Sequence, residues 1–99
     1  MDPQLPTDAD TNRFFSHVID RLESSGVYSQ QEACDLVREY YQKFRDPQYC
    51  QSIKIATQDD DFFFHEGVGG MARRIHYYLT LKGDPNPQSF VKWRNSIGK

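Results

Sequence analysis

A glycine-rich segment that runs into two arginines is the first feature of the sequence that could carry chemistry. Residues 67–74 read GVGGMARR, and the free N–H groups at a helix start, together with guanidinium groups, can bind an anion. The segment lacks the GK[ST] ending of a P-loop and the frame of a dinucleotide-binding fingerprint. Two interpretations remain open: Gly69, Gly70, Arg73 and Arg74 bind phosphate, or the glycines only let the backbone bend sharply.

The histidines do not have the spacing of a metal site. His65, Glu66 and His76 do not form HExxH, and His17 lies far away in the sequence; zinc needs three or four ligands. The Asp59–Asp61 run lacks the glycine and closing glutamate of an EF-hand loop. We therefore expect no metal, no cofactor and no enzymatic activity. A small enzyme or metal protein that uses His65, Glu66 and His76 is the weakest hypothesis.

Four tyrosines occur as two adjacent pairs, Tyr40-Tyr41 and Tyr77-Tyr78. Neighbours on a helix point about 100° apart, so each pair should place one ring inward and one near the rim. By phase Tyr78 joins Met71 on the inner face, which leaves Tyr77 more outward. Exposed tyrosines beside charge are typical of protein-binding hot spots; the alternative is packing at the edge of the core.

The charges are unevenly distributed along the chain. The net charge is -2, from 12 Lys+Arg and 14 Asp+Glu. Residues 1–66 contain 13 acids and 6 bases and sum to -7, whereas residues 67–99 contain 1 acid and 6 bases and sum to +5. The two segments either complement each other within the fold or form two functional faces of opposite sign.

Apolar periodicity predicts four helices. The first spans about residues 8–25, with Gly26 in the left-handed position after its last turn. The second opens with a capping box, Ser29 with Glu32, and stops before Pro47. The third begins near Gly69 or Gly70 and runs to Leu81, with Gly83 as its stop. The fourth follows Asn86 as N-cap, with Pro87 at the first helical position.

The segment between the second and third predicted helices is less regular. Ile53 and Ile55 alternate with polar residues, Asp59–Asp61 resembles a turn, and three phenylalanines follow. Either a β-hairpin or an irregular loop pinned by Phe62 and Phe64 fits this pattern. The predicted fold class is thus mainly α: a four-helix single domain, residues 8–99, with an irregular or β-hairpin insert around residues 52–65. Residues 1–7 are expected to be a flexible N-terminal arm.

The two cysteines and the termini bear on the compartment. Cys34 and Cys50 are too few for a disulfide framework and form no CxxC pair. The N-terminus lacks the pattern of a secretory signal, and no stretch approaches the roughly 18 apolar residues of a membrane span. We expect a cytoplasmic protein with reduced thiols and no membrane partner.

The overall plan resembles that of the small four-helix immunity proteins that neutralise nuclease bacteriocins. The likeness rests on a Phe/Val first helix, the Ser-x-x-Glu box before Leu36-Val37, the aspartate-rich stretch, and the closing Val91-Lys92-Trp93-Arg94 with Gly98-Lys99. The short third helix of that family, with paired tyrosines before a proline, is not reproduced, so no toxin-contact residue is carried over. The resemblance implies inhibition by binding, with the acidic second helix and nearby tyrosines covering a basic nuclease.

The leading hypothesis is a non-enzymatic protein-binding module, an immunity- or antitoxin-like inhibitor of a basic partner. Its alternative is nucleic-acid or phosphate-ligand binding through the basic C-terminal third, residues 67–99. Composition excludes a disordered tail, because 14% of the residues are aromatic, and a bulk nucleic-acid condenser, because the chain is not basic. The candidate contact residues for the leading hypothesis are Asp35, Glu39, Tyr40, Tyr41, Asp59, Asp60 and Asp61.

Overall fold

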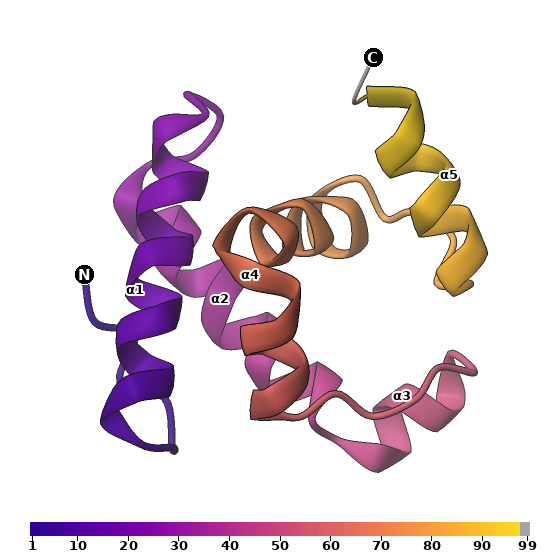
Figure 1. Cartoon of the computed structure of the whole chain (residues 1–99), viewed down its shortest axis with the longest axis horizontal. Coiled ribbons are helices and arrows are strands. Elements are labelled where there is room, and N and C mark those ends of the chain that lie inside the picture. Colours follow the sequence, from indigo (N-terminus) through magenta and orange to yellow (C-terminus); the bar gives the residue numbers. More distant parts are fainter. Residues whose placement is uncertain (98–99) are drawn as a thin grey trace.

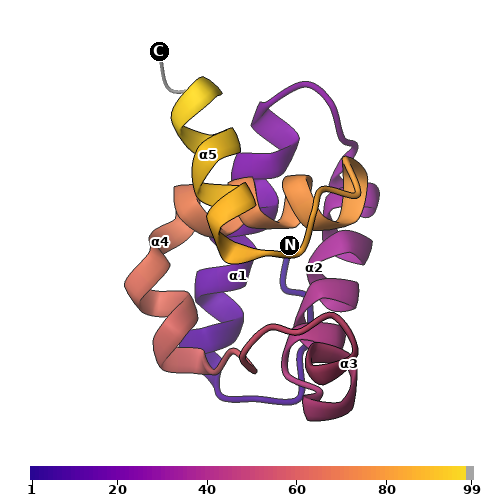
Figure 2. The ribbon, with the colours of Figure 1, turned by 90° about the vertical axis from the view of Figure 1, so that its right-hand side faces the viewer.

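The computed structural model describes residues 1–97, in which all regular secondary structure is helical (Figure 1). The mainly α fold is confirmed, but the described residues form more helices than the four expected. Figures 1 and 2 place α3 and α5 toward opposite ends of the molecule. The elements are α1 (Ala9–Ser24), α2 (Gln30–Phe44), α3 (Pro47–Ser52), α4 (Asp60–Ile75), the π-helical segment η1 (His76–Thr80) and α5 (Pro87–Ile97).

Helices α1 and α2 form the hairpin that carries much of the core. Gly26 adopts φ 81° after the last turn of α1, as its position predicts. The Ser29 side chain accepts from the Glu32 N–H while the Glu32 side chain accepts from the Ser29 N–H, so the predicted capping box is confirmed. The facing stripes of the two helices are buried, and each helix contributes apolar side chains to one core: Phe15, Val18, Ile19 and Leu22 from α1, with Ala33, Val37, Tyr40 and Phe44 from α2.

The β-hairpin alternative for residues 52–65 is wrong, because no strand occurs among residues 1–97. Residues 47–52 form α3, and residues 53–59, between α3 and α4, lie outside the helices. The aspartate run begins a helix instead of making a turn. The Asp59 carboxylate accepts the Phe62 N–H at 2.8 Å, and Asp60 and Asp61 lie in the first turn, where the helix dipole favours acids. The three phenylalanines therefore belong to α4, which starts well before Gly69.

A sharp bend at Gly67 divides α4 into two limbs. Gly67 has φ 82° and ψ 168°, a left-handed conformation that glycine adopts without steric cost. Figure 1 shows the chain changing direction between the first limb, residues 60–66, and the second limb, residues 68–75. The interpretation that a glycine lets the backbone bend sharply is therefore confirmed at Gly67.

The orientation predicted for the second tyrosine pair is confirmed relative to the core, but Tyr77 is not exposed: Tyr78 packs against the core cluster, with its ring centroid 5.2 Å from that of Phe44, and Tyr77 lies outside that cluster. Tyr77 is buried and Tyr78 is only partly buried. Tyr77 is covered by α5 instead of by the core, with its ring centroid 5.4 Å from that of Phe90 and 5.1 Å from that of Trp93. The connector to α5 also covers the Tyr77 ring: its hydroxyl donates to the Asp84 carbonyl at 2.7 Å, and the Gly83 N–H donates to the Tyr77 carbonyl at 3.0 Å.

Residues 1–7 are packed against the helices, in contrast to the flexible arm that we expected. Pro3 and Leu5 are buried. The Asn12 side chain accepts the Leu5 N–H at 2.7 Å and donates to the Leu5 carbonyl at 3.1 Å, and Arg38 Nε donates to the Pro3 carbonyl at 2.8 Å. These bonds satisfy backbone groups that burial would otherwise leave unpaired, so the segment is part of the domain.

The C-terminal helix begins as predicted. The Asn86 side chain accepts the Gln88 N–H at 2.8 Å, and Pro87 is the first residue of α5. Phe90 buries its ring completely. Within residues 1–97 we find no helix that combines the length and apolar character needed to cross a bilayer.

The contact between Gly83 and Tyr77 makes a stability prediction. A Cβ at residue 83 would overlap the Tyr77 ring, so we expect Gly83→Ala to lower the free energy of unfolding by about 1–3 kcal/mol, measured by urea titration. Gly69→Ala is the matched control, because a Cβ there meets only the Arg21 guanidinium at an ordinary 3.5 Å. If both variants are as stable as the wild type, the close packing of the connector on Tyr77 is wrong.

Candidate functional site

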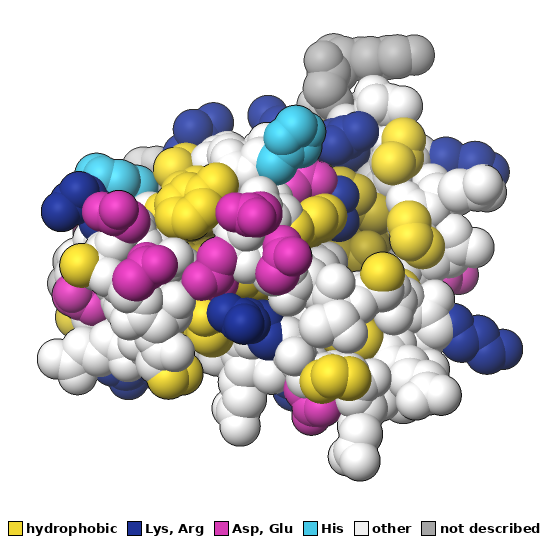
Figure 3. Space-filling model, turned by 60° about the horizontal axis from the view of Figure 1, so that its bottom comes forward, with side chains coloured by type: hydrophobic (Ala, Val, Ile, Leu, Met, Phe, Trp, Pro, Cys, Tyr) yellow, Lys and Arg dark blue, Asp and Glu magenta, His cyan; other side chains and the backbone are white. Residues whose placement is uncertain are grey.

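Helices α1 and α4 begin at the same end of the molecule, and their N-caps and first turns carry five aspartates. The Asp60 carboxylate accepts the Thr7 and Thr11 hydroxyls at 2.8 and 3.3 Å, which ties the start of α4 to the start of α1. Figure 3 shows acidic side chains gathered around an exposed hydrophobic patch on this face. We call this surface the acidic end; its carboxylates are Asp8, Asp10, Asp59, Asp60 and Asp61.

The five carboxylates differ in how far they are engaged within the fold. Asp8 and Asp59 cap their helices, and the hydrogen bond from the Thr11 N–H lowers the pKa of Asp8. Asp60 binds the Arg45 guanidinium at 2.8 Å. Asp10 makes only an exposed ion pair with Arg13 at 3.5 Å, and the Asp61 side chain has no hydrogen bond to any residue in the described part of the chain. Asp10 and Asp61 are therefore the carboxylates most available to a partner.

An exposed phenylalanine lies among these carboxylates. Phe64 is 44% exposed, and its ring meets the Phe14 ring edge-on with centroids 5.2 Å apart. Sequence reasoning missed Phe64 as a surface residue because the three phenylalanines were assigned to a strand or a pinned loop. Helical geometry could have predicted the exposure of Phe64. If Phe63 is fully buried, its two neighbours on the helix point about 100° to either side of it.

The tyrosines predicted for the binding face are buried in the core, so the prediction that one of them lies near the rim is wrong. The Tyr40 ring stacks on Phe44 at 4.0 Å between centroids, its hydroxyl donates to Gln58 at 2.6 Å, and burial raises its pKa. Tyr41 is only 4% exposed, because the N-terminal segment and α4 cover it. Its hydroxyl donates to Asp60 at 3.2 Å, so Tyr41 supports the acidic end from beneath.

The acids predicted on α2 lie away from the acidic end. Asp35 is exposed and accepts from Gln31 at 2.9 Å. Glu39 pairs with Lys43 at 2.8 Å, and this hydrogen bond raises the pKa of Lys43. Arg45, further along the same helix, is the residue that contacts Asp60; at 1.5 Å per residue, Asp35 lies about 15 Å from it along the axis. The structure therefore separates the predicted acidic residues into two places.

The predicted anion site is divided in the same way. Arg74 donates to Glu66 through Nε at 2.9 Å and Nη2 at 2.5 Å, and its guanidinium lies over the Phe62 and Phe90 rings at 4.9 and 4.4 Å. A Cβ at Gly70 would meet the Glu66 carboxylate at 3.0 Å. Arg74 is thus engaged in an ion pair with Glu66, and Gly70 lies against the Glu66 carboxylate of that pair, so the structure places both at an internal contact and not beside Arg73.

The two remaining residues of that prediction, Gly69 and Arg73, line a cavity of about 350 Å³ together with Arg21. We call it the basic cavity, formed where α1, the second limb of α4, η1 and α5 meet. Arg21 comes from the acidic first segment of the sequence, so charge counting could not place it here. Whether residues 67–99 bind nucleic acid or a phosphate ligand stays a prediction at this point.

The histidines lie apart from one another. His65 and His17 are exposed, and His76 Nδ1 bonds to the Tyr28 hydroxyl at 2.5 Å. Among residues 1–97, no three or more His, Cys, Asp or Glu side chains are grouped so that they could hold a metal ion. Both cysteines are free and buried, and burial raises the pKa of the Cys50 thiol.

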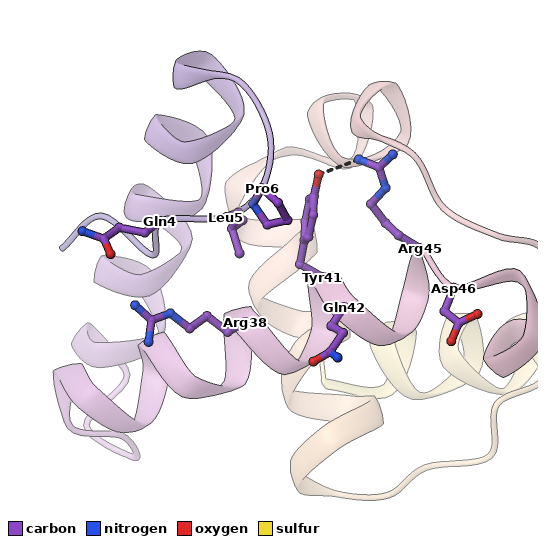
Figure 4. Close-up of a pocket in the computed structure, with 8 residues that line it drawn as sticks. All are labelled: Gln4, Leu5, Pro6, Arg38, Tyr41, Gln42, Arg45 and Asp46. Carbon is purple, nitrogen blue, oxygen red and sulfur yellow. Dashed lines mark hydrogen bonds between the residues drawn. The ribbon is translucent and has the colours of Figure 1, made fainter.

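A second cavity, of about 620 Å³, lies between the N-terminal segment and α2. Figure 4 shows Arg38 and Arg45 toward its two ends, with Tyr41 between them. Both guanidinium groups are already engaged, Arg38 with the Pro3 carbonyl and Arg45 with Asp60. The Gln4 and Gln42 side chains, which also line this cavity, form no hydrogen bond with another of residues 1–97.

The described residues form a mainly helical fold with an acidic end and a basic cavity. No protein-family model matches the chain, and neither a curated protein nor a solved structure is significantly similar to it. The resemblance to nuclease immunity proteins stays a prediction, and its terminal Gly98-Lys99 element lies outside the described residues.

The Glu66–Arg74 pair predicts an asymmetry between two glutamate substitutions. The side chains of Glu66 and Arg74 are only 18% and 13% exposed. Glu66→Ala therefore leaves the nearly buried Arg74 guanidinium without its partner. We expect a loss of about 3 kcal/mol in the free energy of unfolding.

The matched control is Glu39→Ala, which removes an ion pair whose partners are both 41% exposed and should cost about 0–1 kcal/mol. Urea titration of both variants measures the difference. Equal losses would show that the Glu66–Arg74 pair does not join the two limbs of α4.

Proposed function

We propose that this protein is a non-enzymatic binding module, an inhibitor of the immunity or antitoxin kind, which captures a basic protein through its acidic end. The observation that carries the proposal is the exposed Phe64 ring surrounded by carboxylates. An apolar anchor within a charged rim is the usual composition of an interface that both attracts and holds a partner.

The two kinds of group act on different steps of binding. Carboxylates such as Asp10 and Asp61 attract a basic surface and raise the association rate, whereas burial of an aromatic ring lowers the dissociation rate. In the absence of a ligand, about 44% of the Phe64 surface remains exposed and would be covered by the partner. The Phe14 ring supports it at the edge.

The outer acids of α2 belong to the same proposal as secondary contacts. A standard interface covers about 800 Å² on each partner, which is wide enough to extend from the acidic end to Glu39 and Asp35. Glu39 is engaged with Lys43, so its contribution is smaller than that of the unpaired Asp61.

The test uses the wild-type protein as bait for capture from its host, followed by binding kinetics with the captured protein. We expect a basic partner whose association rate falls steeply between low and physiological salt, because exposed charges are screened beyond about 10 Å at 0.1 M. If the partner is a nuclease, the protein should inhibit its activity in proportion to binding.

Two variants separate the contributions. Asp10→Asn with Asp61→Asn should lower mainly the association rate and reduce its salt dependence, and Phe64→Ala should raise the dissociation rate by about tenfold or more, as expected for a hot-spot residue. The charge-matched control is Asp20→Asn with Glu23→Gln, two exposed acids further along α1. The proposal fails if the control lowers association as much as the first pair, or if neither rate changes.

A further inference from the structure

The basic cavity collects positive charge without any acidic side chain in its lining. Arg21 at the end of α1 and Arg73 on α4 both line it. Neither guanidinium forms an ion pair or side-chain hydrogen bond with another of residues 1–97. A hollow lined by two unpaired cations favours an anion, because its walls concentrate the positive potential.

The backbone of the second limb of α4 adds to this potential. Gly69 lies in the first turn after the Gly67 bend, and a Cβ at that position would be 3.5 Å from the Arg21 guanidinium. The N–H groups of a first helical turn carry partial positive charge. The absent side chain at Gly69 thus lets Arg21 approach this turn closely.

The remaining wall of the cavity is aromatic and apolar. The Trp93 ring lies 6.2 Å from the His76 ring, between centroids, and both line the cavity. Val27 and Ile97 are 61% and 50% exposed at its margin. A cavity that is cationic on one side and aromatic on the other fits a ligand that carries an anionic group and an aromatic ring.

A hydrogen-bonded group orients the histidine in this wall. The Tyr28 hydroxyl contacts both His76 Nδ1 and Thr80 Oγ1 at 2.5 Å. Because Nδ1 is engaged, Nε2 is the ring nitrogen able to bond to a ligand. The volume of about 350 Å³ falls at the lower end of the range for small-molecule pockets, which favours a small ligand over a polymer.

We propose that the basic cavity binds a small aromatic anion, with its carboxylate or phosphate between Arg21 and Arg73 and its ring against Trp93. The site is separate from the acidic end, so the failure of one proposal leaves the other unaffected. The GVGGMARR segment predicted anion binding without a defined cavity or ligand class, and the basic cavity supplies both.

The chain contains one tryptophan, so the indole N–H resonance of Trp93 reports binding without ambiguity in an NMR titration. Four probes separate the parts of the ligand: phenyl phosphate, 3-phenylpropanoate, benzyl alcohol and inorganic phosphate. We expect saturable shifts of the Trp93 resonance with the two aromatic anions. Benzyl alcohol and inorganic phosphate should bind at least about tenfold more weakly, since each lacks one half of the recognition.

Paired substitutions then assign the cationic wall. Arg21→Gln with Arg73→Gln should weaken phenyl phosphate binding by about tenfold or more, while leaving the circular dichroism spectrum unchanged. The control, Arg13→Gln with Lys92→Gln, removes two exposed cations that do not line the cavity and should bind like the wild type.

Three results would overturn the proposal. The first is the absence of a saturable Trp93 shift with either aromatic anion at millimolar concentration. The second is binding of inorganic phosphate as tight as that of phenyl phosphate, which would leave no role for the aromatic wall. The third is equal weakening by both pairs of substitutions, which would reflect net charge and not the cavity.

Discussion

The ion pair between Glu66 and Arg74 spans the bend at Gly67, and the arrangement of both charged surfaces depends on it. The two residues lie on different limbs of α4, and the guanidinium also covers Phe62 from the first limb and Phe90 from α5. One side chain thus joins three parts of the fold. Without this joint, the left-handed Gly67 would act as a hinge, because glycine imposes little restriction on the backbone. The first limb supplies the acidic end and the second limb supplies a wall of the basic cavity, so this pair determines how the two surfaces are oriented.

Features decided by neighbouring residues could be predicted from the sequence. The capping box of Ser29 and Glu32, the left-handed Gly26 and the Asn86-Pro87 start of α5 each depend on groups within four positions. Two caps were missed: Asp46, which accepts the Gln48 N–H at the start of α3, and Asp59, where the aromatic run behind it suggested a strand or an irregular loop. A local rule therefore works where no competing propensity lies beside it.

Features decided by distant segments could not be predicted. The burial of Tyr77 depends on α5 and on the connector that folds back over the ring, and neither is visible in the apolar spacing of its own helix. The packing of Leu5 depends on Asn12 of α1, and the cationic wall of the cavity depends on Arg21, which belongs to a segment that is acidic overall. The sequence therefore indicated which kinds of residue form each candidate surface, but not which individual residues. Phe64 takes the place of the tyrosines on the acidic end, and Arg21 takes the place of Arg74 beside Arg73.

The opposite charges of the two surfaces can coexist on a domain this small because helix α1 separates them. Asp10 lies at the start of α1 and Arg21 near its end, which places them about 16 Å apart along the axis at 1.5 Å per residue. This separation exceeds the screening length of about 8 Å at physiological ionic strength, so neither surface neutralises the other. The net charge of -2 therefore combines an acidic and a basic surface that lie apart, and a partner or ligand bound at one of them experiences mainly the charge of that surface. The two interpretations of the uneven charge, pairing within the fold and two faces of opposite sign, are therefore compatible. Glu66 and Arg74 neutralise each other between the two surfaces, while Asp61 and Arg73 remain exposed.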